Sequence, residues 1–408
     1  MKNKKNIYLD HAAATPLDQR VLKAMLPFFD KTFANPSSLH SPGQAANKAV
    51  MQSRKSIATI LNGHADEIIF TSGGTESDGL AIRGVLEAAV PKLGWDGSTQ
   101  VPHVVTTAIE HHAVLEPLMY LQKIGAIKLT VIKPKKDGVV SVQDVLDAIK
   151  HNTVLVSVMY ANNEIGTIQP IAEIGKALLK LRKENNSALP YFHSDACQAA
   201  GYLDLNVEKL HVDLLTLNAG KIYGPKGVGL LFVRRGTKLA PITRGGGQER
   251  GLRSGTENVP GIVGMAKALE LVQKDREKES KRLSLLRNRL IDGLLRLPKS
   301  RLNGGADQRL PNNVNISFLD IEGEAAMLYL DAKGIACSTG SACASSSLDP
   351  SHVILALGMS YEAAHGSLRF TLGKSTTKSD VDYVISVMPG IVEMLRKISP
   401  VTLDMKNF

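Results

Sequence analysis

Residues 214–227 read Leu-Leu-Thr-Leu-Asn-Ala-Gly-Lys-Ile-Tyr-Gly-Pro-Lys-Gly. A short apolar run is followed at once by glycines and a proline that surround Lys221, which predicts a strand leading into a tight turn. Residues 191–198, Tyr-Phe-His-Ser-Asp-Ala-Cys-Gln, place Asp195 at the end of another apolar run, 26 residues before Lys221. We therefore expect Lys221 and Asp195 to emerge at the ends of two strands.

The surrounding sequence alternates between strand-like runs and helical patterns. We predict strands at residues 67–71, 103–108, 153–160, 189–194, 214–217 and 229–234, and helices at 77–89, 113–123 and 171–183. This alternation predicts an α/β fold with a mainly parallel sheet and helices on both faces. In such sheets ligands bind beyond the carboxyl ends of the strands. Five polar side chains follow predicted strands: Thr75, His111, Asn163, Asp195 and Lys221.

A lysine in a tight turn beside an acid on another strand is the arrangement that holds pyridoxal 5'-phosphate. The lysine forms the Schiff base, and the acid keeps the pyridine nitrogen protonated so that the ring can accept electrons. The alternative for Lys221 is an exposed surface charge, which its position directly after an apolar strand disfavours. A buried Asp195 needs a partner.

Residues 71–77, Thr-Ser-Gly-Gly-Thr-Glu-Ser, lie between a predicted strand and a helix. Backbone N–H groups around Gly74 and Thr75, at a helix N-terminus, would bind the cofactor phosphate. The alternative is an ordinary capped turn. A nucleotide-binding P-loop is excluded, because the segment lacks the Gly-Lys-Ser/Thr ending.

His111 and Asn163 lie in turns after predicted strands. His111 could stack on a cofactor ring and move protons near neutral pH; the alternative is a structural loop histidine. Its neighbour His112 points elsewhere, so we expect no shared metal site. Asn163 lies in Asn-Asn-Glu-Ile-Gly, a pattern also typical of a simple turn.

The remaining chain predicts a long amphipathic helix at 259–297, then strands at 313–318 and 368–372 with helices around them. We expect residues 16–260 to form a large cofactor-binding domain, and residues 1–15 with 261–408 to form a smaller α+β domain. Arg369 is a charge inside a strand pattern. It could hold a carboxylate through two parallel hydrogen bonds, or form a structural salt bridge.

The three cysteines are an odd number in a long chain, so a disulfide framework is not expected. Cys343 lies in Gly-Ser-Ala-Cys-Ala-Ser-Ser-Ser, which predicts a loop around residues 337–348 that presents an accessible thiol nucleophile. The spacing of Cys337 and Cys343 excludes a CxxC pair. Cys197 is interpreted as a small buried hydrophobe.

Composition is that of an ordinary globular protein of 408 residues. The net charge of +10 is spread along the chain and mixed with acids, so we expect a solvated surface and no direct nucleic-acid partner. No apolar run has membrane-spanning length and the N-terminus lacks a signal-like stretch, so we expect a cytoplasmic protein.

Taken together, these motifs resemble the class V aminotransferase-like enzymes of PLP fold type I, specifically the cysteine desulfurases of the NifS/IscS kind. The resemblance covers nearly the whole chain. It is carried by residues 8–16, 35–38, 71–78, 110–111, 162–166, 195 and 198, 221–227, 253–256, 340–343 and 369.

The resemblance implies a seven-stranded, mainly parallel sheet and a homodimer. Lys221 would carry the cofactor, Asp195 would contact the ring nitrogen, and His111 would stack and move protons. Further cofactor contacts are implied for Gly74, Thr75, Asn163, Gln198 and Asn218, with Thr256 reaching across from the second subunit, and substrate contacts are implied for Asn35, Asn163 and Arg369. L-cysteine would lose its α-proton, and the Cys343 thiolate would attack the substrate sulfur, which leaves a persulfide and releases alanine.

Two positions depart from the family pattern. The family usually has serine three residues before the lysine and histidine directly before it, whereas this chain has Asn218 and Gly220. Asn218 and backbone N–H groups would then contact the phosphate. The chain ends at Phe408, so we expect no extended tail that docks an iron–sulfur scaffold, and the sulfur acceptor stays open between iron–sulfur assembly and tRNA thiolation. The alternatives are a selenocysteine lyase, and a non-catalytic assembly subunit with a weakened cofactor site.

Overall fold

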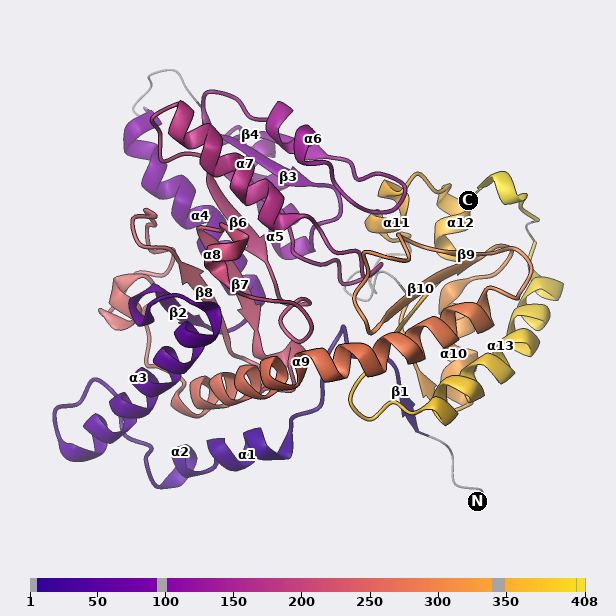
Figure 1. Cartoon of the computed structure of the whole chain (residues 1–408), viewed down its shortest axis with the longest axis horizontal. Helices are drawn as coiled ribbons and strands as arrows, with labels where there is room; N and C mark the ends of the chain where they lie inside the picture. The colour runs from indigo at the N-terminus through magenta and orange to yellow at the C-terminus, as the bar shows by residue number, and fades with distance from the viewer. Residues whose placement is uncertain (1–5, 94–100, 340–348, 401, 408) are drawn as a thin grey trace.

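The computed structural model describes residues 6–93, 101–339, 349–400 and 402–407. Its centre is a seven-stranded sheet (Figure 1). Across the sheet the strands are β2 (Ile68–Thr71), β8 (Gly229–Val233), β7 (Leu214–Asn218), β6 (Tyr191–Asp195), β5 (Thr153–Ser157), β3 (His103–Thr107) and β4 (Lys128–Ile132). Only β8 runs against its neighbours, β7 and β2; every other pair is parallel. The predicted mainly parallel sheet is confirmed.

Helices cover both faces of this sheet, as predicted. The apolar residues of α4 (Gly74–Leu93) and α5 (His112–Lys123) pack on one face. Those of α3 (Ser41–Leu61), α6 (Val142–Asp147), α7 (Ile171–Glu184) and the first half of α9 (Val259–Leu294) pack on the other. Leu214 and Leu215 are both fully buried on opposite faces, which explains why the strands read as continuous apolar runs.

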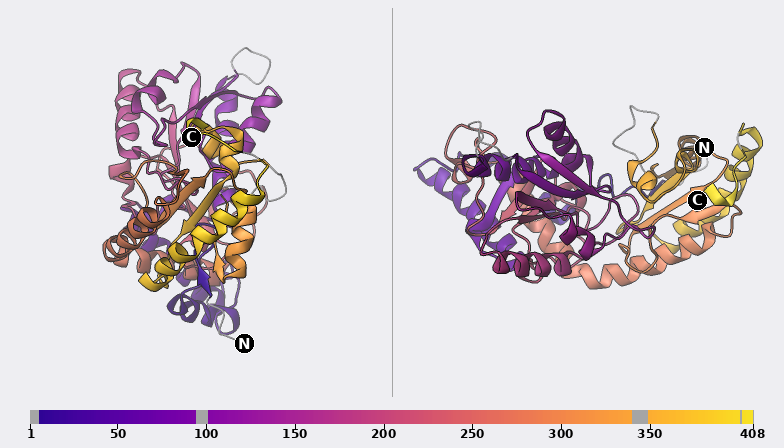
Figure 2. Two further views of the ribbon diagram at one scale, coloured as in Figure 1. Left: turned by 90° about the vertical axis from the view of Figure 1, so that its right-hand side faces the viewer. Right: turned by 90° about the horizontal axis from the view of Figure 1, so that it is seen from above.

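A second core forms around an antiparallel sheet in which β10 (Asn313–Phe318) lies between β9 (Ser300–Leu302) and β12 (Ser367–Thr371). It is covered by α10 (Gly323–Ala332), α13 (Lys378–Ile398) and the second half of α9. Helix α9 therefore contributes to both cores, and the right-hand view of Figure 2 shows it running along one side of the molecule from the first core to the second. It ends at Leu294, three residues before the predicted end.

The N-terminal segment connects the two cores. Strand β1 (Ile7–Tyr8) pairs with β11 (Ile335–Ala336) beside the second core. The chain then passes to α1 (Gln19–Met25) and α2 (Pro27–Asp30), which lie against α9 on the first. Two short helices, α11 (His352–Ala356) and α12 (Tyr361–His365), follow residues 340–348. In the described part of the chain no helix is long and apolar enough to cross a bilayer.

Candidate active site

A cavity of about 330 Å³ lies where the carboxyl ends of the central strands meet. Because β2 runs against β8, and β8 runs against β7, strand β2 points in the same direction as the parallel strands. Residues that follow five strands therefore reach one cavity. Its lining includes all five polar residues predicted from strand ends, Thr75, His111, Asn163, Asp195 and Lys221, together with Gly74, Gln198, Asn218 and Arg369.

Lys221 ends a short 3₁₀ turn (Ala219–Lys221) directly after β7. Asn218 caps this turn, since its Oδ1 accepts a hydrogen bond from the Gly220 N–H at 3.0 Å. The Lys221 Nζ donates to the carbonyl oxygens of Ala12, at 3.0 Å, and Ala13, at 2.6 Å. The lysine is thus held at the cavity by the N-terminal segment.

Asp195 is the last residue of β6 and only 7% exposed. One of its oxygens accepts the backbone N–H of Cys197 at 2.8 Å. Gln198, one turn further, donates from its Nε2 to the Ala12 carbonyl at 3.0 Å. The carboxylate therefore lies at the floor of the cavity, one strand away from Lys221.

His111 caps the N-terminus of α5, because its Nδ1 accepts the Ala113 N–H at 3.0 Å. The neutral ring therefore carries its proton on Nε2. Burial lowers the pKa of His111, and the charge of Lys221 lowers it further, while Asp195 acts in the opposite direction. A neutral imidazole that donates from Nε2 is thus the form expected at neutral pH.

The wall around the N-terminus of α4 is suited to a phosphate. Gly74 begins this helix, and an added Cβ there would lie 3.0 Å from Cys197 Sγ and 3.6 Å from Asn218 Nδ2. The absence of a side chain leaves the helix N-terminus open, and the Asn218 amide is close to it. Thr75, at the second position of the helix, is exposed to the cavity. Backbone N–H groups, a helix dipole and an amide donor favour an anion here.

Arg369 lies on β12 and reaches the cavity from the second core. Its Nη2 forms a salt bridge with Asp10 at 2.9 Å, and its Nη1 donates to the Asn163 carbonyl at 3.2 Å. Its Nε is buried and has no hydrogen-bond partner among the described residues. The structure therefore combines both predicted alternatives, a structural salt bridge and a guanidinium that lines a ligand cavity.

These residues fit pyridoxal phosphate by their chemistry. Asp195 ends β6 and Lys221 lies in the turn after β7, the adjacent parallel strand, and a helix N-terminus freed by Gly74 opens into the same cavity. Lys221 could carry the aldehyde, Asp195 could face a protonated ring nitrogen, and the α4 N-terminus could bind the phosphate. Among the described residues, no three or more His, Cys, Asp or Glu side chains are grouped so that they could hold a metal ion.

Two predicted residues do not line this cavity, and a third lies outside the described part of the chain. Asn35 is exposed in the connection between α2 and α3, where its Oδ1 accepts the Ser37 N–H at 2.9 Å. Thr256 is exposed just before α9. Cys343 lies outside the described residues. Cys197 and Cys337 are both buried, in agreement with the interpretation of Cys197 as a small buried residue.

Sequence reasoning missed three contributors to the site. Ala12–Ala13 and Asp78 line the cavity, and Asp10 pairs with Arg369, which lines it. Asp10 and the two alanine carbonyls come from the N-terminal segment, far away in sequence. Asp78 lies within the first turns of α4 and is 1% exposed. In the sequence, the signal for Asp78 is an acidic residue within a predicted helix. Its neighbours Ser77 and Leu80 follow an ordinary helical pattern and add nothing to that signal.

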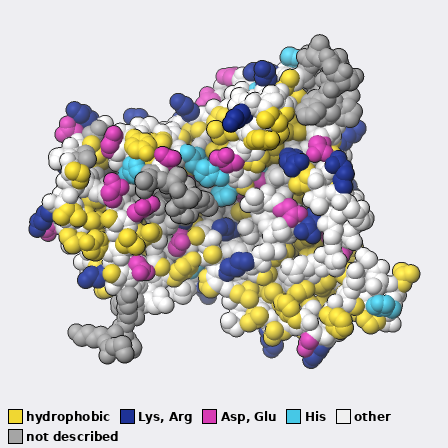
Figure 3. Space-filling view, turned by 180° about the vertical axis from the view of Figure 1, so that it is seen from behind, with side chains coloured by type: hydrophobic (Ala, Val, Ile, Leu, Met, Phe, Trp, Pro, Cys, Tyr) yellow, Lys and Arg dark blue, Asp and Glu magenta, His cyan; other side chains and the backbone are white. Residues whose placement is uncertain are grey.

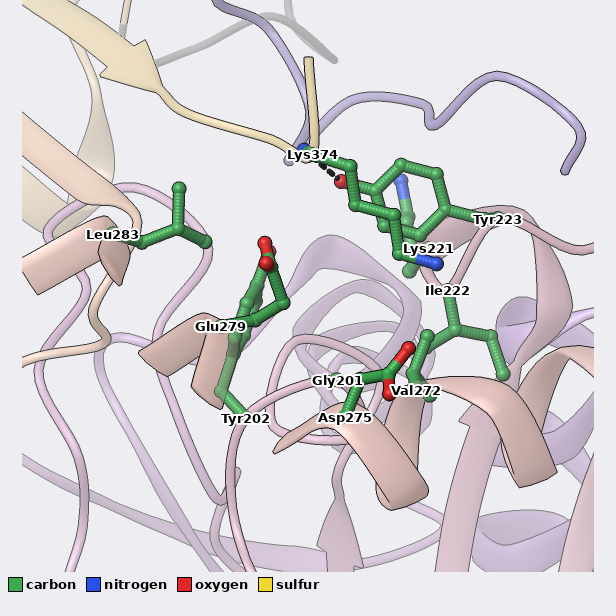
Figure 4. A pocket seen from close by; sticks show the side chains of 10 residues that line it. All are labelled: Gly201, Tyr202, Lys221, Ile222, Tyr223, Val272, Asp275, Glu279, Leu283 and Lys374. Atoms are coloured by element: carbon green, nitrogen blue, oxygen red, sulfur yellow. Dashed lines mark hydrogen bonds between the residues drawn. The ribbon is translucent and has the colours of Figure 1, made fainter. Parts of the chain in front are cut away.

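A second cavity lies behind Lys221 and is much smaller, about 10 Å³ (Figure 4). The Lys374 side chain lies across the Tyr223 ring there, with its Nζ 4.4 Å from the ring centroid. The Lys374 backbone N–H also donates to Tyr223 Oη at 2.9 Å. This space holds about one water molecule, so the larger cavity is the candidate ligand site.

Comparisons with known proteins agree with this geometry. Residues 7–384 match the family model described as Aminotransferase class-V, so the chain belongs to the class-V aminotransferase family. It is 50% identical over 407 residues to the cysteine desulfurase IscS of Clostridium botulinum (strain Hall), a match that covers 99% of this chain and 98% of that protein.

Two solved structures are similar over most of the chain. One, described as a NifS-like protein, is 36% identical with a TM-score of 0.86 and covers 96% of this chain and 100% of its own. The other, described as SspA in complex with cysteine, is 34% identical with a TM-score of 0.76 and covers 90% of this chain and 99% of its own. The resemblance to cysteine desulfurases is confirmed, and this family uses pyridoxal phosphate.

Proposed function

We infer that this chain is a pyridoxal-phosphate-dependent cysteine desulfurase, which converts L-cysteine to L-alanine and takes the sulfur onto Cys343. The observation that carries the inference is the meeting of Lys221, Asp195 and Arg369 at one cavity, in a chain half identical to a cysteine desulfurase. Lysine and aspartate serve the cofactor, and arginine serves an amino-acid carboxylate.

When bound, pyridoxal phosphate supplies an electron sink that weakens bonds to the substrate α-carbon. The protein positions and protects this chemistry. Asp195 would hold the ring nitrogen, Gln198 the ring hydroxyl, and Asn218 with the α4 N-terminus the phosphate. His111 would lie against the ring and donate a hydrogen bond from Nε2. The Lys221 amine would hold the cofactor and would be a base placed to move the α-proton of the substrate.

Substrate selection would depend on Arg369 and Asn163. Arg369 lines the cavity, so its guanidinium would meet a substrate carboxylate there, while Asp10 holds the Nη2 side. The Cys343 thiolate would then attack the substrate sulfur and form the S–S bond as the carbon–sulfur bond breaks, so sulfur passes to the enzyme as a persulfide.

We also propose a homodimer. Large apolar side chains are exposed on the arm formed by α2 and the connection to α3: Phe29 is 60%, Phe33 75% and Leu39 90% exposed. Figure 3 shows hydrophobic side chains gathered over this arm. A patch of this kind on a globular protein marks an interface. Asn35 on the arm and Thr256 before α9 are exposed, which supports the proposal that they complete the site of a second subunit.

The remaining proposals concern organisation and partners. We propose a division into a large unit, residues 16–260, and a smaller unit, residues 1–15 and 261–408. The separate core around β10 supports a smaller unit, and α9 joins the two units because it packs on both cores. We propose that the persulfide sulfur passes to an acceptor protein for iron–sulfur clusters or tRNA thiolation, in the cytoplasm.

The visible absorbance of the protein with pyridoxal phosphate, before and after L-cysteine is added, tests the function. We expect a cofactor band that requires Lys221 and shifts with L-cysteine, and sulfide release in reductant that is lost in Cys343→Ala. Sulfide formation that survives Cys343→Ala would contradict the assigned sulfur acceptor.

Two alternatives are decided by the same preparation. Higher turnover on L-selenocysteine than on L-cysteine would identify a selenocysteine lyase. The absence of any cofactor band at saturating pyridoxal phosphate would support a non-catalytic assembly subunit, which Gly220 motivates.

A further inference from the structure

A second buried carboxylate lies at the floor of the active-site cavity. Asp78 belongs to α4, is 1% exposed and lines the cavity together with Asp195. Its Oδ1 is buried and makes no hydrogen bond within the described residues. The basic group near it is His193, whose Nε2 lies 3.4 Å from that oxygen.

His193 is fixed from both sides. It lies on β6 two residues before Asp195, so both side chains are on the same face of the strand. Its Nδ1 is 2.8 Å from Ser157 Oγ on β5, and its Nε2 is 3.1 Å from Thr216 Oγ1 on β7. The ring is fully buried. Hydroxyls on both neighbouring strands thus hold the imidazole between Asp78 and the sheet.

Burying several carboxylates together is costly unless a positive charge compensates for them. Burial raises the pKa of Asp78 to about 6, and the charge of Asp195 contributes, while His193 acts in the opposite direction. Burial likewise raises the pKa of Glu110 to about 8, with smaller contributions from Asp195 and Asp78. Cys197 also faces this group, and burial together with the two aspartates raises the pKa of its thiol. The floor of the cavity therefore favours a cation.

We propose that Asp78 and His193 form a positioning pair behind Asp195, which makes the cavity select a ring with a protonated nitrogen. The proposal rests on the cofactor-binding function proposed above. A positive ring nitrogen at Asp195 would stabilise the ionised form of Asp78. Binding of the protonated ring and ionisation of Asp78 therefore favour each other by the same factor. His193, held by Ser157 and Thr216, fixes the position of the Asp78 carboxylate in the cavity that Asp195 also lines.

The test compares two ligands on the apoprotein: pyridoxine 5'-phosphate, and its carbocyclic analogue with CH in place of the ring nitrogen. Neither has an aldehyde, so binding is read by calorimetry without reaction at Lys221. For Asp78→Asn at pH 7.5 we expect pyridoxine phosphate to bind about tenfold more weakly, and the analogue less than about twofold more weakly. Ser157→Ala, which removes one support of His193, should show the same selectivity at about threefold.

The matched control is Thr106→Val. Thr106 is fully buried and donates to the Ser157 carbonyl at 3.1 Å, so the variant removes a buried hydrogen bond beside the pair without touching a charge. We expect less than about a twofold change for either ligand. In the wild type, pyridoxine phosphate should lose more affinity than the analogue as the pH falls through 6, because Asp78 becomes protonated; Asp78→Asn should remove this difference.

Equal weakening of both ligands in Asp78→Asn and Ser157→Ala would overturn the positioning pair, because it would show a purely structural role. If Asp78→Asn fails to fold, the ratio in Ser157→Ala decides. A wild type that discriminates between the ligands but releases no sulfide from L-cysteine would contradict the proposed function and support the pair. A wild type that releases sulfide from L-cysteine but does not discriminate between the ligands would support the proposed function and contradict the pair.

Discussion

Gly220 offers a direct test of how this chain binds the cofactor phosphate. It lies between Asn218 and Lys221, at the position where the family usually has histidine. Its backbone is outside the positive-φ region that only glycine tolerates well. A Cβ there would lie 3.4 Å from Asn218 Oδ1 and 3.8 Å from Lys226 Cγ, which are ordinary contacts. We therefore expect Gly220→His to fold without strain.

The size of the effect follows from one added hydrogen bond. The new side chain would start beside Asn218, whose amide lies near the N-terminus of α4 where we place the phosphate. A hydrogen bond to a charged group contributes about 1.5–3 kcal/mol, and fixing the new side chain costs about 1 kcal/mol. The net gain of about 1 kcal/mol corresponds to roughly fivefold tighter binding of pyridoxal phosphate.

The assay is a titration of apoprotein with pyridoxal phosphate, followed by visible absorbance, at pH 7.5. Gly220→Ala is the matched control, since it adds the Cβ without a donor and should bind within about twofold of the wild type. If Gly220→His and Gly220→Ala bind equally, the side chain does not reach the phosphate and the placement of the phosphate beside Asn218 is wrong. A large loss in both would refute the contact distances around Gly220.

Three further predictions concern the acids around the cavity. Burial raises the pKa of Glu110 to about 8, so the folded state retains a proton that the unfolded state loses. The free energy of unfolding should therefore fall by on the order of 3 kcal/mol from pH 5 to 8.5. Urea unfolding of Glu110→Gln over the same pH range should show a smaller fall. Burial also raises the pKa of Glu164 to about 7, while the Ser351 hydroxyl and Arg369 lower it. The ionised carboxylate near Arg369 should raise KM for L-cysteine above pH 7. Glu164→Gln should remove that rise in KM, while kcat changes little. Asp10→Asn removes the carboxylate that pairs with the Arg369 guanidinium, so KM for L-cysteine should change several-fold while the Kd for pyridoxal phosphate stays within about twofold. An unchanged KM with weaker binding of pyridoxal phosphate would show that Asp10 acts on cofactor binding instead.

The central sheet and five of its polar residues could be predicted because their signals are local. Each of these strands is buried on both faces and reads as an apolar run, as in Leu214–Asn218. Each site residue follows such a run within a few positions, and parallel strands bring their carboxyl ends to one edge. The position of these five residues in the sequence was therefore enough to predict that they lie at one edge of the sheet.

Strand β4 was missed because it lies at the edge of the sheet. Of its five residues, Lys128–Ile132, only Ile132 is buried, so neither an apolar run nor a clean alternation is present. The seventh strand was implied only by the family resemblance. Asp78 was missed for a different reason: helical periodicity describes which face of α4 is buried, but it does not show which buried atom meets a strand residue such as His193.

The contribution of the N-terminal segment could not be predicted, because it depends on contacts between residues at least 186 positions apart. Asp10 pairs with Arg369, whereas the Ala12 carbonyl accepts from both Gln198 and Lys221. Thr15 then donates to the Gly220 carbonyl and accepts the Tyr223 N–H. Short, common residue types in this segment carry no chemical signal of their own.

These contacts also show how the two halves of the site are aligned. The lysine belongs to the large sheet, and Arg369 belongs to the smaller one, so their separation depends on how the two cores pack. One turn bonds to both within four residues, from Asp10 to Ala13. Its position is fixed on one side by the bridge between Asp10 and Thr371. Because a reacting group displaced by about 1 Å can lose much of its catalytic effect, the backbone of residues 10–13 aligns the cofactor-binding and carboxylate-binding groups as directly as any side chain in the cavity.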